Sequence, residues 1–105
     1  MTISIVNRND ILMINLPAQF DFKHQATFRK AYEDNLDKSV KKIVLNFGKT
    51  DYLDSASLGM MLVLRDYIEN NSHINLSEIK LSNCQEEIKQ ILTVANFSTL
   101  FSVDF

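Results

Sequence analysis

The residues best suited to chemistry lie in a short turn, Asp54-Ser55-Ala56-Ser57, where a strand-like segment gives way to an apolar helix. Asp and Ser are favoured at helix N-caps, where a side-chain oxygen accepts a hydrogen bond from an unpaired backbone N–H. Either Asp54 or Ser55 is suited to be the cap. A phosphate on Ser55 would be favoured by the helix dipole, yet it would place a like charge beside Asp54. The turn therefore predicts a phosphorylatable switch, although ordinary helix starts share this pattern.

Other side chains that support catalysis or metal binding form no recognisable set. Ser55 lacks the Gly-x-Ser-x-Gly surroundings of a hydrolase nucleophile, and we expect His24 and His73 at the surface, in polar segments. With one cysteine, Cys84, the chain has no zinc pattern, and this thiol is expected in the core or at a helix start. The two glycines form no phosphate-binding loop. We expect no enzyme activity, no metal and no cofactor.

Length and charge limit the classes of function. A chain of 105 residues with 46% apolar residues suits one domain with one core, which we expect to span residues 1–105. The 11 basic and 13 acidic residues are interspersed and give a formal charge of -2. This distribution offers neither a basic stripe nor a polybasic cluster. We therefore expect no direct binding to nucleic acid or to a membrane.

Targeting and membrane signals are weak along the chain. From Met1 to Leu16, apolar and polar residues alternate, and a polar turn interrupts the segment. A secretory signal has a continuous apolar stretch instead. The longest apolar run, Leu58 to Leu64, is far shorter than the roughly 20 residues that cross a bilayer. The single Cys84 fits a reducing compartment. We expect a cytoplasmic protein, with a monomer as the default state.

The elements that position the turn begin with a hairpin. Apolar residues at Ile3–Ile5 and Ile11–Ile14 flank a polar turn at Asn7–Asp10, which predicts two antiparallel strands. Apolar residues then recur at helical spacing inside a charged stretch, which predicts an amphipathic helix from about Lys23 to Asp37. The residues that mark this helix are Phe28, Ala31, Tyr32 and Leu36.

The remaining elements alternate between strand and helix. They are a buried strand at Ile43–Phe47, a helix at Ser57–Glu69, a strand at Ile74–Leu81, a helix that starts near Ser82 or Asn83 and includes Ile88 to Ala95, and an edge strand at Leu100–Phe105. The order strand-strand-helix-strand-helix-strand-helix-strand predicts an α/β fold. We expect a mixed sheet of four to five strands with helices packed on it.

The run Asp54-Ser55-Ala56-Ser57-Leu58-Gly59 resembles the Asp-Ser-Ser/Thr-Gly-Leu-Gly signature of bacterial anti-sigma factor antagonists, small members of the STAS domain family. Further segments are similar to the family in order and spacing: Ile11 to Asp21, with its loop aspartate at Asp21; Lys42 to Phe47 followed by Asp51-Tyr52-Leu53; and Ile88 to Phe97. The resemblance covers nearly the whole chain and implies a single STAS domain.

The resemblance also implies which residues act. The family is phosphorylated on the residue after the aspartate, which corresponds to Ser55. Ala56 replaces Ser or Thr, and Ser57 replaces glycine. Ser57 is thus a weaker candidate acceptor, and a first-turn serine that bonds local backbone is its simpler interpretation. Partner contacts are expected at Asp21, Asp54, Ser55, Ser57 and Met60, the last because methionine adapts to varied protein surfaces.

By resemblance, the unphosphorylated protein binds an anti-sigma factor or a serine kinase of the switch-kinase type, and phosphorylation of Ser55 releases it. A PP2C-like phosphatase would reverse the change. The controlled programme, whether transcription, motility, biofilm, secretion or stress, is not encoded in the chain. One alternative is a STAS scaffold in a sensory or transport assembly that works without phosphorylation. A second is a receiver domain with Asp51 or Asp54 as phosphoacceptor, although that family's paired N-terminal acidic residues and late lysine are missing.

Overall fold

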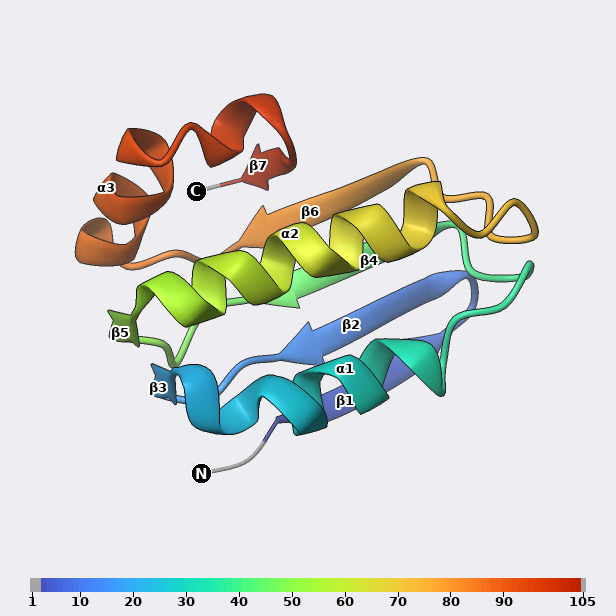
Figure 1. The fold of residues 1–105 in the computed structure, drawn as a ribbon, viewed down its shortest axis with the longest axis horizontal. Coiled ribbons are helices and arrows are strands. Elements are labelled where there is room, and N and C mark those ends of the chain that lie inside the picture. Colours follow the sequence, from blue (N-terminus) through green and yellow to red (C-terminus); the bar gives the residue numbers. More distant parts are fainter. Residues whose placement is uncertain (1–2, 105) are drawn as a thin grey trace.

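A mixed five-stranded sheet carries the fold in the computed structural model, which describes residues 3–104 (Figure 1). In spatial order its strands are β1 (Ser4–Arg8), β2 (Ile11–Asn15), β4 (Lys42–Asn46), β6 (Glu78–Ser82) and β7 (Ser102–Asp104). β1 runs antiparallel to β2, and every later neighbour is parallel. The predicted α/β fold with a mixed sheet is therefore confirmed.

Helices and short 3-10 turns connect these strands. They are η1 (Phe22–His24), α1 (Gln25–Glu33), α2 (Ser55–Glu69), α3 (Glu86–Val94) and η2 (Phe97–Thr99). Figure 1 shows α1 and α2 lying across the same face of the sheet, with α3 beyond β6 and close to β7. Within residues 3–104, no helix has the length and apolar character that a bilayer crossing demands.

The helix-covered face of the sheet forms the core. Strand register places Ile14, Leu45 and Leu81 in one row across β2, β4 and β6, and all three side chains are fully buried. Each such aliphatic side chain stabilises the fold by about 1.5–3 kcal/mol when it leaves water. The opposite face is more polar and carries the ion pair Lys42–Glu78, at 3.1 Å. Burial of one face only explains why apolar and polar residues alternate along the strands.

Several boundaries differ from the predictions. The hairpin turn is shorter than expected, because Asn7 and Arg8 stay on the β1 ladder opposite Leu12 and Ile11. The chain reverses at Asn9, whose φ is 59°. This left-handed conformation is tolerated by asparagine better than by most residues. The predicted turn at Asn7–Asp10 was therefore too long.

The first helix ends at Glu33 instead of Asp37 and is preceded by η1. Asn35 Nδ2 donates to the backbone oxygen of Ala31 at 2.7 Å, which gives the last turn a side-chain partner. Leu36 remains buried although it lies beyond the helix. The amphipathic spacing thus identified the buried positions correctly and overestimated the helix length.

The later elements also begin and end at other residues. β6 starts at Glu78, not Ile74, because Ile74 still belongs to a turn, in which its N–H donates to the Asn71 carbonyl at 3.0 Å. Ser77 N–H and Oγ then donate to the Lys41 carbonyl, at 2.6 and 2.9 Å, just before the ladder. The predicted helix start at Ser82 or Asn83 was wrong, since Ser82 closes β6 and α3 begins at Glu86. The edge strand is limited to β7, and Phe105 lies outside the described residues.

Two short strands outside the main sheet were not predicted as a pair. β3 (Gln19–Phe20) and β5 (Tyr52–Leu53) form a parallel two-stranded sheet. The segment before β5 is held by Thr50, whose buried Oγ1 donates to the Pro17 carbonyl at 2.9 Å. The Thr50 carbonyl in turn accepts from Gln85 Nε2 at 3.0 Å. Thr50 therefore ties the approach to β3, the approach to β5 and the start of α3 together.

Asparagine side chains connect the carboxyl ends of the strands. Asn46 Nδ2 donates to Asn15 Oδ1 at 2.7 Å, and Asn46 Oδ1 accepts from Asn83 Nδ2 at 3.0 Å. The same oxygen accepts the backbone N–H of Gly48 at 3.0 Å. A Cβ at position 48 would lie 3.2 Å from Asn46 Oδ1, so glycine suits this close approach. These amides fix the loop that leads into β5.

Replacing Thr50 by valine should destabilise the fold by about 1–3 kcal/mol, because the buried Pro17 carbonyl loses its donor. Urea unfolding monitored by circular dichroism measures this change. Thr93→Val is the matched control, since Thr93 is exposed and its Oγ1 bonds only the Lys89 carbonyl in its own helix. Equal losses in the two variants would contradict the role given to Thr50.

Candidate functional site

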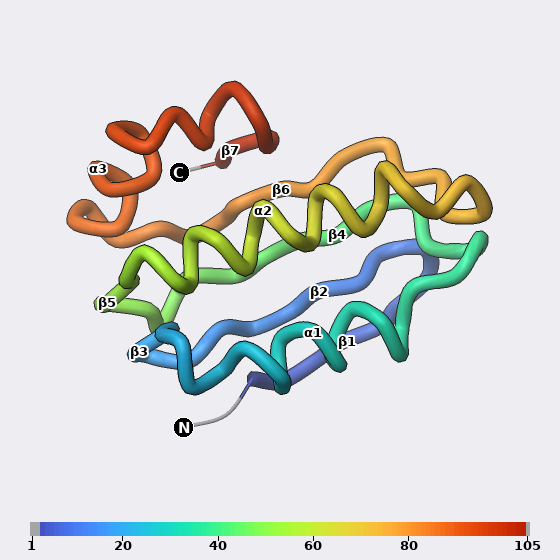
Figure 2. The backbone as a smooth tube through the Cα atoms, in the orientation of Figure 1, coloured from blue at the N-terminus to red at the C-terminus, as the bar shows by residue number. Residues whose placement is uncertain are grey.

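The β3–β5 pair brings two distant loops together. Phe20 lies opposite Leu53 in the parallel ladder, so the next residues, Asp21 and Asp54, leave the pair side by side. Figure 2 shows β3 and β5 as neighbours at one end of the molecule. The backbone N–H of Phe22 also donates to Asp54 Oδ2, at 3.4 Å. Asp21 and Asp54, predicted separately from sequence, thus belong to one surface.

Asp54 is the N-cap of α2. Its extended backbone precedes the helix, and its Oδ1 accepts the N–H of Ser57 at 2.8 Å. Ser57 Oγ accepts the Asp54 N–H at 2.9 Å and donates to the Asp54 carbonyl at 2.7 Å. These bonds form a capping box with serine in place of the usual Glu or Gln. Of the two cap residues allowed by the sequence, the structure selects Asp54.

Ser55 is the first residue of α2 and is exposed to solvent. A phosphate attached there would stand at the positive end of a helix dipole, which favours negative charge. It would also stand beside the Asp54 carboxylate, which already accepts the N–H groups of Ser57 and Phe22. Phosphorylation at this position would thus add charge to the surface and leave the cap in place.

Ser57 occupies a different environment. Its side chain is fully buried, and its hydroxyl both donates and accepts within the cap. A phosphate on this oxygen would have to break the capping box. The geometry gives Ser57 the local backbone-bonding arrangement that was its simpler interpretation, and it presents Ser55 as the accessible hydroxyl.

Asp21 caps η1 and contacts a histidine. Its Oδ1 accepts the Lys23 N–H at 3.0 Å and lies 3.4 Å from His24 Nδ1. The side chain of His24 is only 18% exposed, so its predicted surface position was wrong, whereas His73 is exposed as predicted. His24 is less exposed than expected because it packs near the ring of Phe20, at a centroid distance of 6.4 Å. Among residues 3–104, no three His, Cys, Asp or Glu side chains gather into a metal site.

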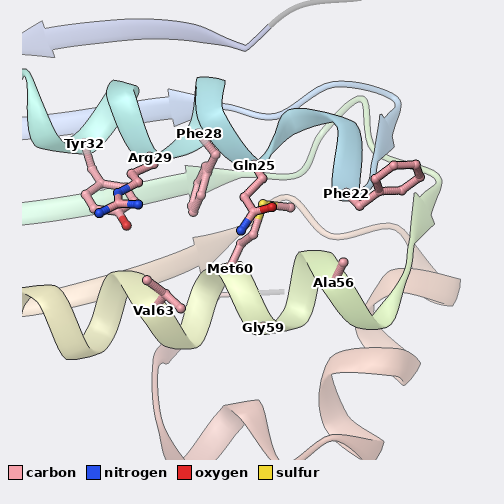
Figure 3. Close-up of a pocket in the computed structure, with 9 residues that line it drawn as sticks. All are labelled: Phe22, Gln25, Phe28, Arg29, Tyr32, Ala56, Gly59, Met60 and Val63. Carbon is pink, nitrogen blue, oxygen red and sulfur yellow. The ribbon is translucent and has the colours of Figure 1, made fainter.

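Met60 belongs to α2, and its side chain is directed toward α1 (Figure 3). It is 7% exposed, so it offers a partner only a small surface. Neighbouring side chains offer more: Phe22, Leu62 and Val63 are among the exposed large apolar residues. Sequence reasoning did not single them out. The signals were present, because Phe22 directly follows Asp21 and α2 carries more apolar residues than one buried stripe requires.

Cys84 packs against the core and is half-buried. Burial raises the pKa of this thiol to about 11, so the reactive thiolate is scarce at neutral pH. The thiol therefore has the character of a packing group, as expected for a core or helix-start cysteine.

Comparison with known proteins gives a consistent result for the fold. The family model described as the STAS domain matches residues 2–104. A STAS-domain containing protein of Pseudomonas aeruginosa (strain UCBPP-PA14) is 36% identical over 92 residues, which cover 88% of this chain and 86% of that protein. Both matches span the turn at Ser55.

Solved structures extend the likeness. A candidate anti-sigma factor antagonist from Thermotoga maritima superposes with a TM-score of 0.79 at 19% identity, over 98% of this chain and 86% of that one. The Bacillus cell fate determinant SpoIIAA, in its phosphorylated form, gives a TM-score of 0.64 at 15% identity, over 99% of this chain and 92% of that one. At these identities the likeness concerns the fold.

Asp54→Ala should lower the free energy of unfolding by about 0.5–2 kcal/mol, because the N–H of Ser57 loses its acceptor. Asp54→Asn keeps an acceptor oxygen, so its free energy of unfolding should fall clearly less. Urea unfolding of the two variants beside the wild type measures the difference. Equal destabilisation by alanine and asparagine would show that the cap contributes little.

Proposed function

The chain belongs to the STAS domain family, and on that premise we propose that it is a phosphorylation-controlled anti-sigma factor antagonist. The observation that carries the proposal is the exposed hydroxyl of Ser55 at the start of α2, beside the Asp21 loop. The likeness in fold to anti-sigma factor antagonists supports it. The partner is an anti-sigma factor or a serine kinase of the switch-kinase type.

The unphosphorylated protein presents the exposed Ser55 beside the partly buried carboxylates of Asp21 and Asp54. A phosphate on Ser55 adds about 1.5 to 2 negative charges to this surface at neutral pH. The added charge repels acidic groups and carries a desolvation cost in a close contact. A loss of only about 2.7 kcal/mol lowers affinity a hundredfold, so one phosphate is sufficient to release the partner. A PP2C-like phosphatase restores binding.

The capping box makes Ser55 suitable for such a switch. Asp54 and Ser57 satisfy the first turn of α2 without the Ser55 hydroxyl. Modification of Ser55 therefore changes the surface charge while the helix keeps its cap. We assign phosphorylation to Ser55 and keep Ser57 only as a second acceptor that requires local opening.

A STAS scaffold that works without phosphorylation is the second candidate. The exposed Leu62 and Val63 on α2 favour it, since they offer an apolar contact area that does not involve the serine. Such a scaffold would be indifferent to charge at Ser55 and sensitive to changes at exposed apolar residues such as Leu62 and Val63. The experiments on Ser55 separate the two functions.

Ser55→Asp should reduce capture of the partner from native cell extract by about tenfold or more, because it introduces a fixed negative charge at the contact. Ser55→Ala should capture at least as much partner as wild type. Affinity capture followed by quantitative mass spectrometry measures both. Ser72→Asp, an exposed change in the loop after α2, controls for added charge.

The same extract provides a direct test of modification. Mass spectrometry of the peptide that spans Asp51 to Arg65 should show phosphate on Ser55. Phosphate on Ser57 would assign the phosphorylation site to Ser57 in place of Ser55. Equal capture by the Ser55→Ala and Ser55→Asp variants, with no phosphate under several growth conditions, would refute the switch and favour the scaffold.

Asp21→Asn should weaken capture of the same partner several-fold, because it removes a charge from the contact surface. The amide keeps an oxygen that can accept from Lys23 N–H, so η1 should remain capped. Circular dichroism checks the fold, and the capture assay measures binding. If Asp21→Asn and Asp21→Ala both capture as much partner as wild type, the loop has only a structural role.

A further inference from the structure

A recess lies between α1 and the first half of α2, close to Ser55 but outside the polar surface described above. Its volume is about 280 Å³. Figure 3 shows Gln25 and Phe28 from α1 and Met60 from α2 pointing into the gap between the helices. The residues that line it are Phe22, Gln25, Phe28, Arg29, Tyr32, Ala56, Gly59, Met60 and Val63.

The interior of the recess is apolar and rigid. Phe28, Tyr32 and Met60 line it and are buried core residues, which fixes their positions. A Cβ at Gly59 would have nothing within 4 Å, so the backbone of α2 leaves open space at this point. A body of aromatic or short aliphatic character fits such a surface, because burial of apolar area is favourable and needs no directional partner.

The polar groups of the recess come from α1. Arg29 and Gln25 supply hydrogen-bond donors, and no acidic side chain is among the lining residues. Arg29 Nε–H donates to Glu33 Oε2 at 2.8 Å, which holds the guanidinium on this face of α1. A guanidinium has further N–H groups in a planar arrangement that matches a carboxylate. The remaining N–H groups of Arg29 can therefore receive a carboxylate, in competition with Glu33.

We propose that this recess binds a small carboxylic acid with an aromatic or short aliphatic body. The apolar body lies against Phe28 and Met60, and the carboxylate meets Arg29 and the amide of Gln25. The volume is near the lower end of the range for ligand pockets, about 300–1,000 Å³, which limits the ligand to a small molecule.

The surroundings favour a free small molecule over a peptide. On the outer side of α1, the adjoining surface is lined by charged residues that include Lys23, Lys30 and Asp34. Apolar contact is therefore limited on this side of α1, whereas a peptide bound across α1 would need it to continue along the surface. A side chain of a protein partner is the competing occupant, and the experiment separates the two.

A ligand in the recess would also lie near the switch. Ala56 and Phe22 line it, and they directly follow Ser55 and Asp21 in the chain. A bound acid would thus alter the edge of the partner surface. This consequence rests on the proposed function, whereas binding of the acid does not, so a direct binding measurement can fail or succeed independently of the switch.

The experiment titrates the isotope-labelled full chain with 4-phenylbutyrate and follows the amide resonances of Ala56, Gly59 and Met60 by NMR. We expect saturable shifts with a dissociation constant of about 1 mM or lower, as is usual for a ligand of this size. 4-Phenylbutylamine has the same body with the opposite charge and should bind at least tenfold more weakly. Hexanoate tests whether a short aliphatic chain can take the place of the aromatic ring.

Three variants locate the site. Gly59→Leu fills the recess and should abolish the shifts, whereas Gly59→Ala should retain them; both replace glycine by a better helix former, so the fold is kept. Arg29→Gln should weaken binding of the acid about tenfold, by the usual strength of a charged hydrogen bond. Glu33→Gln removes the competing carboxylate and should bind the acid as tightly as wild type or more tightly.

Three results would overturn the proposal. They are the absence of saturation up to about 10 mM of either acid, equal binding of 4-phenylbutyrate and 4-phenylbutylamine, and shifts that persist in Gly59→Leu. If both acids fail to bind and Gly59→Leu nevertheless abolishes partner capture, the recess is a socket for a partner side chain. That result would replace the small-molecule site while leaving the switch at Ser55 intact.

Discussion

The short parallel pairing of β3 with β5 is the constraint on which the site depends. Only Gln19, Phe20, Tyr52 and Leu53 take part, yet their register places Asp21 beside Asp54. Because the pair is so small, it relies on buried bonds around it, above all the one from Thr50 to the Pro17 carbonyl. The polar surface is thus supported by a hydrogen-bonded layer beneath it, and Ser55 is its exposed hydroxyl.

The capping box separates the stability of α2 from the chemistry of its first residue. Asp54 and Ser57 satisfy each other's backbone groups, so Ser55 contributes to the surface without contributing to the cap. The sequence departs here from the family signature, with Ser57 where glycine is usual. The structure gives this departure a physical meaning, since the buried hydroxyl takes the place of the Glu or Gln side chain in a standard box.

Periodicity and capping preferences were sufficient to predict the α/β fold, the mixed sheet and Asp54 as one of two candidate caps of α2. The helix itself begins at Ser55, two residues before the predicted start at Ser57. The buried positions Phe28, Tyr32 and Leu45 followed from the same patterns. Boundaries set by distant contacts were missed, as at Glu78, where β6 starts because the chain there meets Lys42 of β4. The contact between Phe22 and Asp54 and the recess beside Met60 could not be predicted, since both depend on how separate segments pack.

The parallel ladders also determine how the chain reaches its native state. Asn15 and Asn46 bond each other across 31 positions, and Phe22 and Asp54 across 32. Contacts between residues so far apart in sequence require costly loop closure before they stabilise anything, which slows folding. The surface around Ser55 includes one of these long-range contacts, so it is not formed by local sequence alone. On the proposed function, a newly synthesised chain acquires its partner surface together with its fold, so a partly folded chain presents no competent surface to the proposed kinase or partner.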